Sequence, residues 1–209
     1  VPERSASYPS MENMHYDLTV LKRLAISLVV ASTSVGARAQ DRPLQAPSEL
    51  GSTSYLVFLR QQPIGREEVA VVRNAEGWTV RGTSQLGVPV DITTRRAEIR
   101  YDAEWRPLSV LVNSIARGEE IELRTTFTDG KASNEIVTQG NVTPKVDDVS
   151  ADAVVLPNTF LGSYAALAQR LQGLAVNTEL RAYVAPQIEV PVRVAATASE
   201  RIDTPKESI

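Results

Sequence analysis

The sequence predicts a mainly β domain, in which a curved antiparallel sheet of long strands, or a half-barrel, is covered by one α-helix at about residues 159–173. Three observations lead to this fold class. Turn signals recur about every dozen residues, the runs between them show two-residue periodicity, and one later segment changes to helical spacing. This rhythm is typical of antiparallel sheets and differs from the strand–helix alternation of βαβ folds.

The first part of the chain, residues 1–39, has the pattern of upstream residues followed by a secretory signal. Two basic residues at 22–23 precede the apolar run 24–36, and the small-residue motif ARA ends at the predicted cleavage point, Ala39–Gln40. The apolar run is too short to cross a membrane. We therefore expect export to the periplasm or the extracellular space without a transmembrane span; an amphipathic N-terminal helix is the alternative.

The composition of the chain excludes several kinds of chemistry. The predicted leader carries four basic and three acidic residues, so its removal changes the net charge from −3 to about −4, which gives no electrostatic reason to bind nucleic acid. The chain has no cysteine, and its single histidine, His15, lies in the leader. A mature chain without either residue lacks Ser-His-acid and Cys-His arrangements and the nitrogen and sulfur ligands of zinc, and we expect no cofactor.

The remaining chain is long enough for one domain with a substantial core. We expect a linker at 40–52, the β domain at 53–204, and a tail at 205–209 that is truncated if the natural protein is longer. Seven turn signals divide the domain into strands, at residues 61–65, 74–77, 87–89, 102–107, 117–120, 128–130 and 139–144.

Alternation assigns the two faces of several strands. One face of the 120–127 strand carries Ile121, Leu123, Thr125 and Phe127. In the 93–101 strand, Arg96, Glu98 and Arg100 form a solvated face, and the opposite face holds Arg95, Ala97, Ile99 and Tyr101. The last strand has an apolar face formed by Ile188, Val190, Val192 and Val194. Pro191 points outward there and lacks an amide hydrogen, which predicts an edge strand.

The helical segment follows the strand-like run DAVVLP. One apolar stripe predicts its buried face, with residues Phe160, Leu161, Tyr164, Leu167, Ala168 and Leu171. Gly162 and Ser163 are adjacent and therefore do not form the G-x-S-x-G elbow of a serine nucleophile. The stretch GTSQLG, which contains Ser84, is one residue out of the same register. We expect neither serine to be catalytic and the helix to cover the sheet.

Two groups of residues are candidate binding positions. The space between sheet and helix is the first, with an apolar ligand contacted by Trp78, Phe127, Phe160, Tyr164 and Leu167. Trp78 also has the simpler interpretation of strand packing, as does Trp105. The second group is the carboxylates Asp147, Asp148 and Asp152. Their oxygens suit calcium, but the spacing lacks the D-x-D-x-D-G pattern, so we expect solvated acids and no metal.

The segments TSYLVFLRQQPIGREEVAVV, RRAEIRYDAEWRPLSVLVN and LPNTFLGSYAALAQRLQGL carry a resemblance over about residues 53–204. They resemble an uncharacterised β-domain of exported bacterial proteins, which in some of them precedes an α/β-hydrolase domain. The shared points are Gly65, the YDAEWRPL turn and the pattern LPN followed by YAALAQRL; none is a catalytic motif. More distantly, the fold is similar to half-barrels that carry lipoproteins or lipids, which is an analogy of fold alone.

These observations favour a non-catalytic exported module, either packing on a C-terminal hydrolase domain of the same chain or binding an apolar small molecule or lipid. Two alternatives remain open. One is a hydrolase that uses only carboxylates, such as a glycosidase, because paired acids meet only in space. The other is a purely structural envelope protein.

Overall fold

The computed structural model describes residues 48–199, all within one compact unit. The predicted leader, most of the predicted linker and the predicted tail lie outside the described residues. The first strand, β1, begins at Ser48 and so includes the end of the stretch that we expected to be a linker. In the described part of the chain, no helix is long and apolar enough to cross a membrane.

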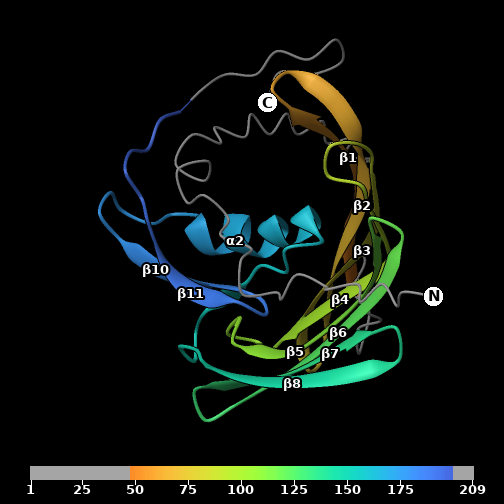
Figure 1. The fold of residues 1–209 in the computed structure, drawn as a ribbon. Helices are drawn as coiled ribbons and strands as arrows, with labels where there is room; N and C mark the ends of the chain where they lie inside the picture. The colour runs from red at the N-terminus through yellow and green to blue at the C-terminus, as the bar shows by residue number, and fades with distance from the viewer. Residues whose placement is uncertain (1–47, 200–209) are drawn as a thin grey trace, which may run out of the picture. The chain divides into compact units, whose positions relative to one another are not determined.

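An antiparallel sheet of eight strands in sequential order dominates the fold, as the sequence predicted (Figure 1). Among the described residues β1 and β8 are its two edges, so the sheet is curved but not closed into a barrel. Its strands are β1 (Ser48–Leu59), β2 (Gln62–Asn74), β3 (Gly77–Leu86), β4 (Ile92–Tyr101), β5 (Pro107–Ala116), β6 (Glu119–Thr128), β7 (Lys131–Thr138) and β8 (Asn141–Asp148).

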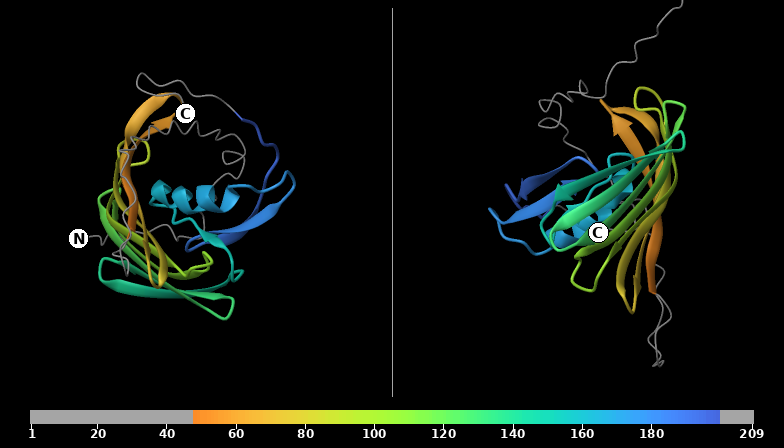
Figure 2. Two further views of the ribbon diagram at one scale, coloured as in Figure 1. Left: turned by 180° about the vertical axis from the view of Figure 1, so that it is seen from behind. Right: turned by 60° about the horizontal axis from the view of Figure 1, so that its bottom comes forward.

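A helix and a small second sheet follow the large sheet. The 3-10 turn η2 (Leu161–Ser163) leads directly into α2 (Tyr164–Leu171). The second sheet contains β9 (Val154–Val155), β10 (Glu179–Val184) and β11 (Ile188–Arg193), and β10 pairs in parallel with β9 and antiparallel with β11. α2 lies on the concave side of the large sheet, between that sheet and the β10–β11 hairpin (Figure 2).

The turn signals explain why the strands connect as hairpins. Each of the seven predicted turns overlaps a connection between successive strands, although residues 62–65 belong to β2 and residues 141–144 to β8. Three connections consist of a residue followed by glycine with positive φ at both positions, namely Arg117–Gly118, Asp129–Gly130 and Gln139–Gly140. This conformation matches the right-handed twist of the flanking strands and favours tight two-residue hairpins.

The predicted strand faces are confirmed with one correction. The Ile121 face of β6 lies inside, and Ala97, Ile99 and Tyr101 of β4 are buried. Arg95 was predicted on that buried face, but its side chain is 60% exposed. The reason is a register shift between Thr94 and Arg96, which breaks the alternation before Ala97. As predicted, β11 is an edge strand, since among the described strands it pairs only with β10.

The helix is present, but its predicted apolar stripe was partly wrong. Ala166 and Leu167 are buried in α2, whereas Tyr164 and Ala168 of the predicted stripe are exposed. The helix begins with a 3-10 turn, which has fewer residues per turn than an α-helix and so shifts the face that the following residues present.

Two glycines allow the start of the helix to approach the sheet. Phe160 is fully buried against Gly82 of β3, where a Cβ atom would lie 2.8 Å from the Phe160 ring and would overlap the carbonyl oxygen of Glu68. A Cβ atom on Gly162 would likewise lie 2.5 Å from the Phe160 ring. The Phe160 side chain therefore fills space that both glycines leave free.

We predict that Gly82→Ala lowers the free energy of unfolding by at least about 2 kcal/mol, because the added methyl overpacks the core against a backbone oxygen. Gly87→Ala is the matched control, since its Cβ atom would meet nothing closer than the Ile64 oxygen at 3.5 Å. It should change stability by less than about 0.5 kcal/mol. Urea denaturation of both variants checks the prediction, and equal effects would contradict it.

Candidate functional site

The inner, concave face of the large sheet carries a buried row of polar side chains, which we call the polar row: Glu67, Ser84, Thr94 and Ser114. These residues are direct cross-strand neighbours on β2, β3, β4 and β5. All four are at most 5% exposed, on a face that is otherwise mainly apolar. Buried polar groups need partners, and the segment that enters the helix supplies two of them.

The polar row holds the start of the helix. The Glu67 carboxylate accepts a hydrogen bond from the backbone N–H of Leu161 at 3.1 Å. The Thr94 hydroxyl donates to the carbonyl oxygen of Thr159 at 2.6 Å and lies 3.1 Å from the Ser114 hydroxyl. The free N–H groups at the beginning of a helix favour a negative charge. Glu67 therefore acts as a helix cap, although it lies on the sheet and not next to the helix in sequence.

Burial raises the pKa of the Glu67 carboxyl above its ordinary value of 4.5, because desolvation disfavours the charged form. Hydrogen bonds from the backbone N–H groups of Leu161 and Gly162 oppose this increase. Ser84 is the cross-strand neighbour of Glu67, but its Oγ has no hydrogen-bond partner among the described residues.

A second row lies next to the polar row, toward the turns at 60–61, 87–91 and 117–118. Its members are apolar or glycine and are paired across five strands, and we call it the apolar row: Val57, Gly65, Leu86, Ile92 and Ala116. Leu86 is buried, and the other members are partly exposed. The polar row therefore separates the apolar row from the main core, whose nearest members include Val69 and Val80.

Of the five residues predicted to line a cavity between sheet and helix, four belong to the hydrophobic core or pack against it. Phe160 is fully buried and Leu167 is 8% exposed, so both belong to the core. Trp78 stacks on Trp105 with ring centroids 4.7 Å apart, and Phe127 meets Tyr183 edge to face at 6.0 Å. Tyr164 is 39% exposed.

Two shallow depressions of the described surface lie elsewhere. One, of about 330 Å³, has a charged lining that includes Arg66, Glu68 and Arg95. The other, of about 290 Å³, lies near Glu120, Ile121 and Gln139. None of the five predicted residues lines either depression.

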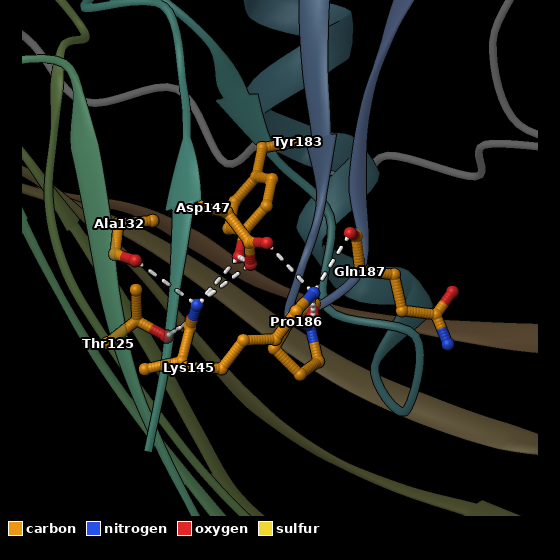
Figure 3. A network of polar contacts seen from close by, with 8 residues as sticks. Thr125, Ala132, Lys145, Asp147, Tyr183, Pro186 and Gln187 are labelled. Carbon is orange, nitrogen blue, oxygen red and sulfur yellow. Dashed lines mark hydrogen bonds and ion pairs between the residues drawn. The ribbon is translucent and has the colours of Figure 1, made fainter. Parts of the chain in front are cut away.

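The second sheet is attached to the first through a polar network that includes Thr125, Asp147 and Tyr183 (Figure 3). The side chain of Asn134 bonds to all three of these residues. Asn134 accepts a hydrogen bond from Thr125 at 2.7 Å and donates to the Tyr183 hydroxyl at 2.9 Å and to Asp147 at 3.0 Å. The Tyr183 hydroxyl in turn donates to Asp147 at 2.6 Å. Burial and the contact with this carboxylate raise the pKa of Tyr183, so its hydroxyl remains a proton donor.

Lys145 extends this network to the β10–β11 turn. Its Nζ lies 2.8 Å from Asp147 and donates to the carbonyl oxygens of Pro186 and Gln187 at 2.7 and 3.1 Å. At the other end of the small sheet, the Tyr101 hydroxyl accepts a hydrogen bond from the Val155 backbone at 3.2 Å. Polar contacts thus fix both β9 and β10 against the large sheet.

The three candidate metal-binding acids have separate partners. Asp147 belongs to the network just described, Asp148 pairs with Lys131, and Asp152 lies 3.7 Å from Arg170. No group of three or more potential metal-binding residues is found within residues 48–199. Ser163 is fully buried, and its hydroxyl donates to the Phe160 carbonyl at 2.8 Å, which is a structural role.

The sequence analysis missed the polar row. A signal was present in β2, where Glu67 alternates with Val69 and Val71 and so lies on an apolar face of the strand. Ser84 shares a face with Leu86 in the same way. The partners of these residues lie far away in sequence, beyond what strand periodicity can identify.

Comparison of the chain with known proteins finds no matching family model, no matching curated protein and no matching solved structure. The resemblance to an exported β-domain therefore stays a prediction.

We predict that Glu67→Gln raises stability at neutral pH, because the amide oxygen can still accept the Leu161 N–H bond without a buried charge. Since the folded pKa is raised, the contribution of Glu67 to stability should be fully present below pH 4.5 and be lost as pH rises through the folded pKa. Glu67→Gln should lack this loss. Glu68→Gln, on the exposed face of β2, is the control. Melting temperatures between pH 4 and 8 check this, and parallel pH profiles for the wild type and Glu67→Gln would contradict it.

Proposed function

We propose that this chain is a non-catalytic, exported binding module that holds an apolar ligand, such as a lipid acyl chain, against the concave face of its sheet. The observation that carries this proposal is the apolar row. It is a continuous cross-strand strip that remains partly exposed because the helix is fixed on the polar row beside it.

The dimensions and chemistry of the strip suit an extended apolar chain. Five strands spaced by about 4.8 Å make a row about 19 Å across. Val57, Ile92 and Ala116 are apolar and partly exposed, so an acyl chain laid across them would remove further apolar surface from water. The polar row beside the strip limits the ligand to one end of the concave face.

We predict that the purified chain binds a fluorescent long-chain fatty acid and that Ile92→Asp weakens this binding at least about tenfold, because it places a charge where the apolar ligand lies. Val57→Asp should act in the same way from the edge strand. Leu108→Asp is the control, since Leu108 is 41% exposed at the start of β5 and lies outside the apolar row.

Fluorescence titration measures the affinity, and circular dichroism verifies that each variant is folded. Native mass spectrometry of the wild type shows whether a lipid is retained during purification. Absence of any fatty-acid binding, or an equal loss of affinity in Ile92→Asp and Leu108→Asp, would contradict the proposal.

A second candidate function is an accessory role beside a hydrolase-type domain, and the outer face of β8 supports it. Val142 and Val146 are 58% and 64% exposed, and they flank Pro144 on one face of this edge strand. Two exposed valines on either side of a proline give an apolar face suited to packing against another domain.

To test the second function, the natural gene is read past the codon for Ile209. If a further domain follows, Val146→Lys in the longer protein should separate the thermal transitions of the two domains, because it removes their apolar contact. Val88→Lys is the control, since Val88 is 83% exposed in a turn. Calorimetry of both variants measures the two transitions. If they remain coupled in Val146→Lys, the outer face of β8 is not the surface that contacts the second domain.

A further inference from the structure

The free edge of β1 differs from the other sheet edges of the described chain. β1 is a 12-residue strand whose only strand neighbour within residues 48–199 is β2. The edge strand β8 contains Pro144, and its Lys145 side chain bonds the β10–β11 turn. The edge strand β11 contains Pro191. Proline and lysine are common means of preventing an edge from pairing with another strand.

β1 has neither of these protections. The stretch Gly51–Leu59 contains no charged residue and no proline. Two large apolar side chains on its outer face are exposed, Leu56 at 70% and Phe58 at 54%. The register with β2 runs without interruption from Ser52 to Val57, so this part of β1 presents a regular row of backbone groups that have no strand partner within residues 48–199. A long, uncharged apolar edge of this kind is suited to pairing with a further strand.

We propose that two copies of this chain associate through their β1 strands, which pair antiparallel about a two-fold axis at Leu56 and continue the sheet from one copy into the other. A two-fold axis at this position sets each Leu56 opposite its counterpart and each Phe58 opposite a Ser54 of the second copy. Both pairs lie on the outer face, so the exposed apolar side chains are covered mutually.

A second copy of this chain is better suited to pair with the free edge of β1 than a charged peptide is. No like charges oppose each other within Gly51–Leu59, because this stretch carries none. An isologous contact of this kind is self-complementary and closes after two copies. Only one strand from each copy takes part, so we expect a dimer that forms and dissociates with protein concentration.

The absence of cysteine allows a direct test. In Leu56→Cys, any disulfide must join two chains. Directly opposed residues of antiparallel strands have Cα atoms about 4.5–5.5 Å apart, which is within disulfide reach. Leu56→Cys should therefore form a covalent dimer under mild oxidation at least about tenfold faster than Leu108→Cys, which exposes a thiol on the internal strand β5.

A second variant measures the association without oxidation. Leu56→Lys should shift the chain from dimer to monomer in light scattering after size exclusion, because it sets two lysines opposite each other, while Leu108→Lys should not. Leu56 is 70% exposed, so its replacement leaves the fold intact by circular dichroism. A wild-type chain that is monomeric at every concentration, or equal cross-linking of the two cysteine variants, overturns the proposal. A monomer that instead takes up a strand from another protein also overturns it.

Discussion

The position of the helix depends on a buried carboxylate. Glu67 is 2% exposed and accepts backbone N–H groups at the start of η2. An eight-residue helix such as α2 is too short to be stable alone, so it forms only because the sheet fixes its first turn and buries one face. The carboxylate in turn tolerates burial only because those N–H groups replace water. Neither partner would be stable in this arrangement without the other.

Hydrogen bonds between buried polar groups also fix the position of the second sheet. The apolar core supplies most of the favourable free energy, but apolar contacts alone leave the relative position of two layers loosely specified. Directional bonds from Asn134 and Tyr183 to Asp147, and from the Val155 N–H to the Tyr101 hydroxyl, define where β9 and β10 lie. Each of these polar groups is paired, which avoids the cost of an unsatisfied buried donor or acceptor.

The large sheet could be predicted because its determinants are local. Residue–glycine pairs such as Asp129–Gly130 set the turns, and two-residue alternation sets the faces. Prediction failed where a local irregularity shifted the periodicity with which side chains face the core. The bulge before Ala97 exposed Arg95, and the 3-10 turn exposed Tyr164. Glu67 escaped notice for a different reason, because its partner, Leu161, lies in a segment distant in sequence that periodicity cannot locate.

The polar row also explains why part of the concave face is left uncovered. A helix held only by apolar contacts could slide along a curved sheet until it covered the most apolar surface, since such contacts are not directional. The bond that Glu67 accepts from Leu161 and the bond that Thr94 donates to Thr159 prevent that movement, because sliding would remove both backbone partners from buried polar groups. The fold would be more stable if Ile92 and Val57 were covered too, because more apolar surface would be removed from water. Fixing the helix beside the apolar row therefore leaves that row partly exposed, at the cost of buried polar groups.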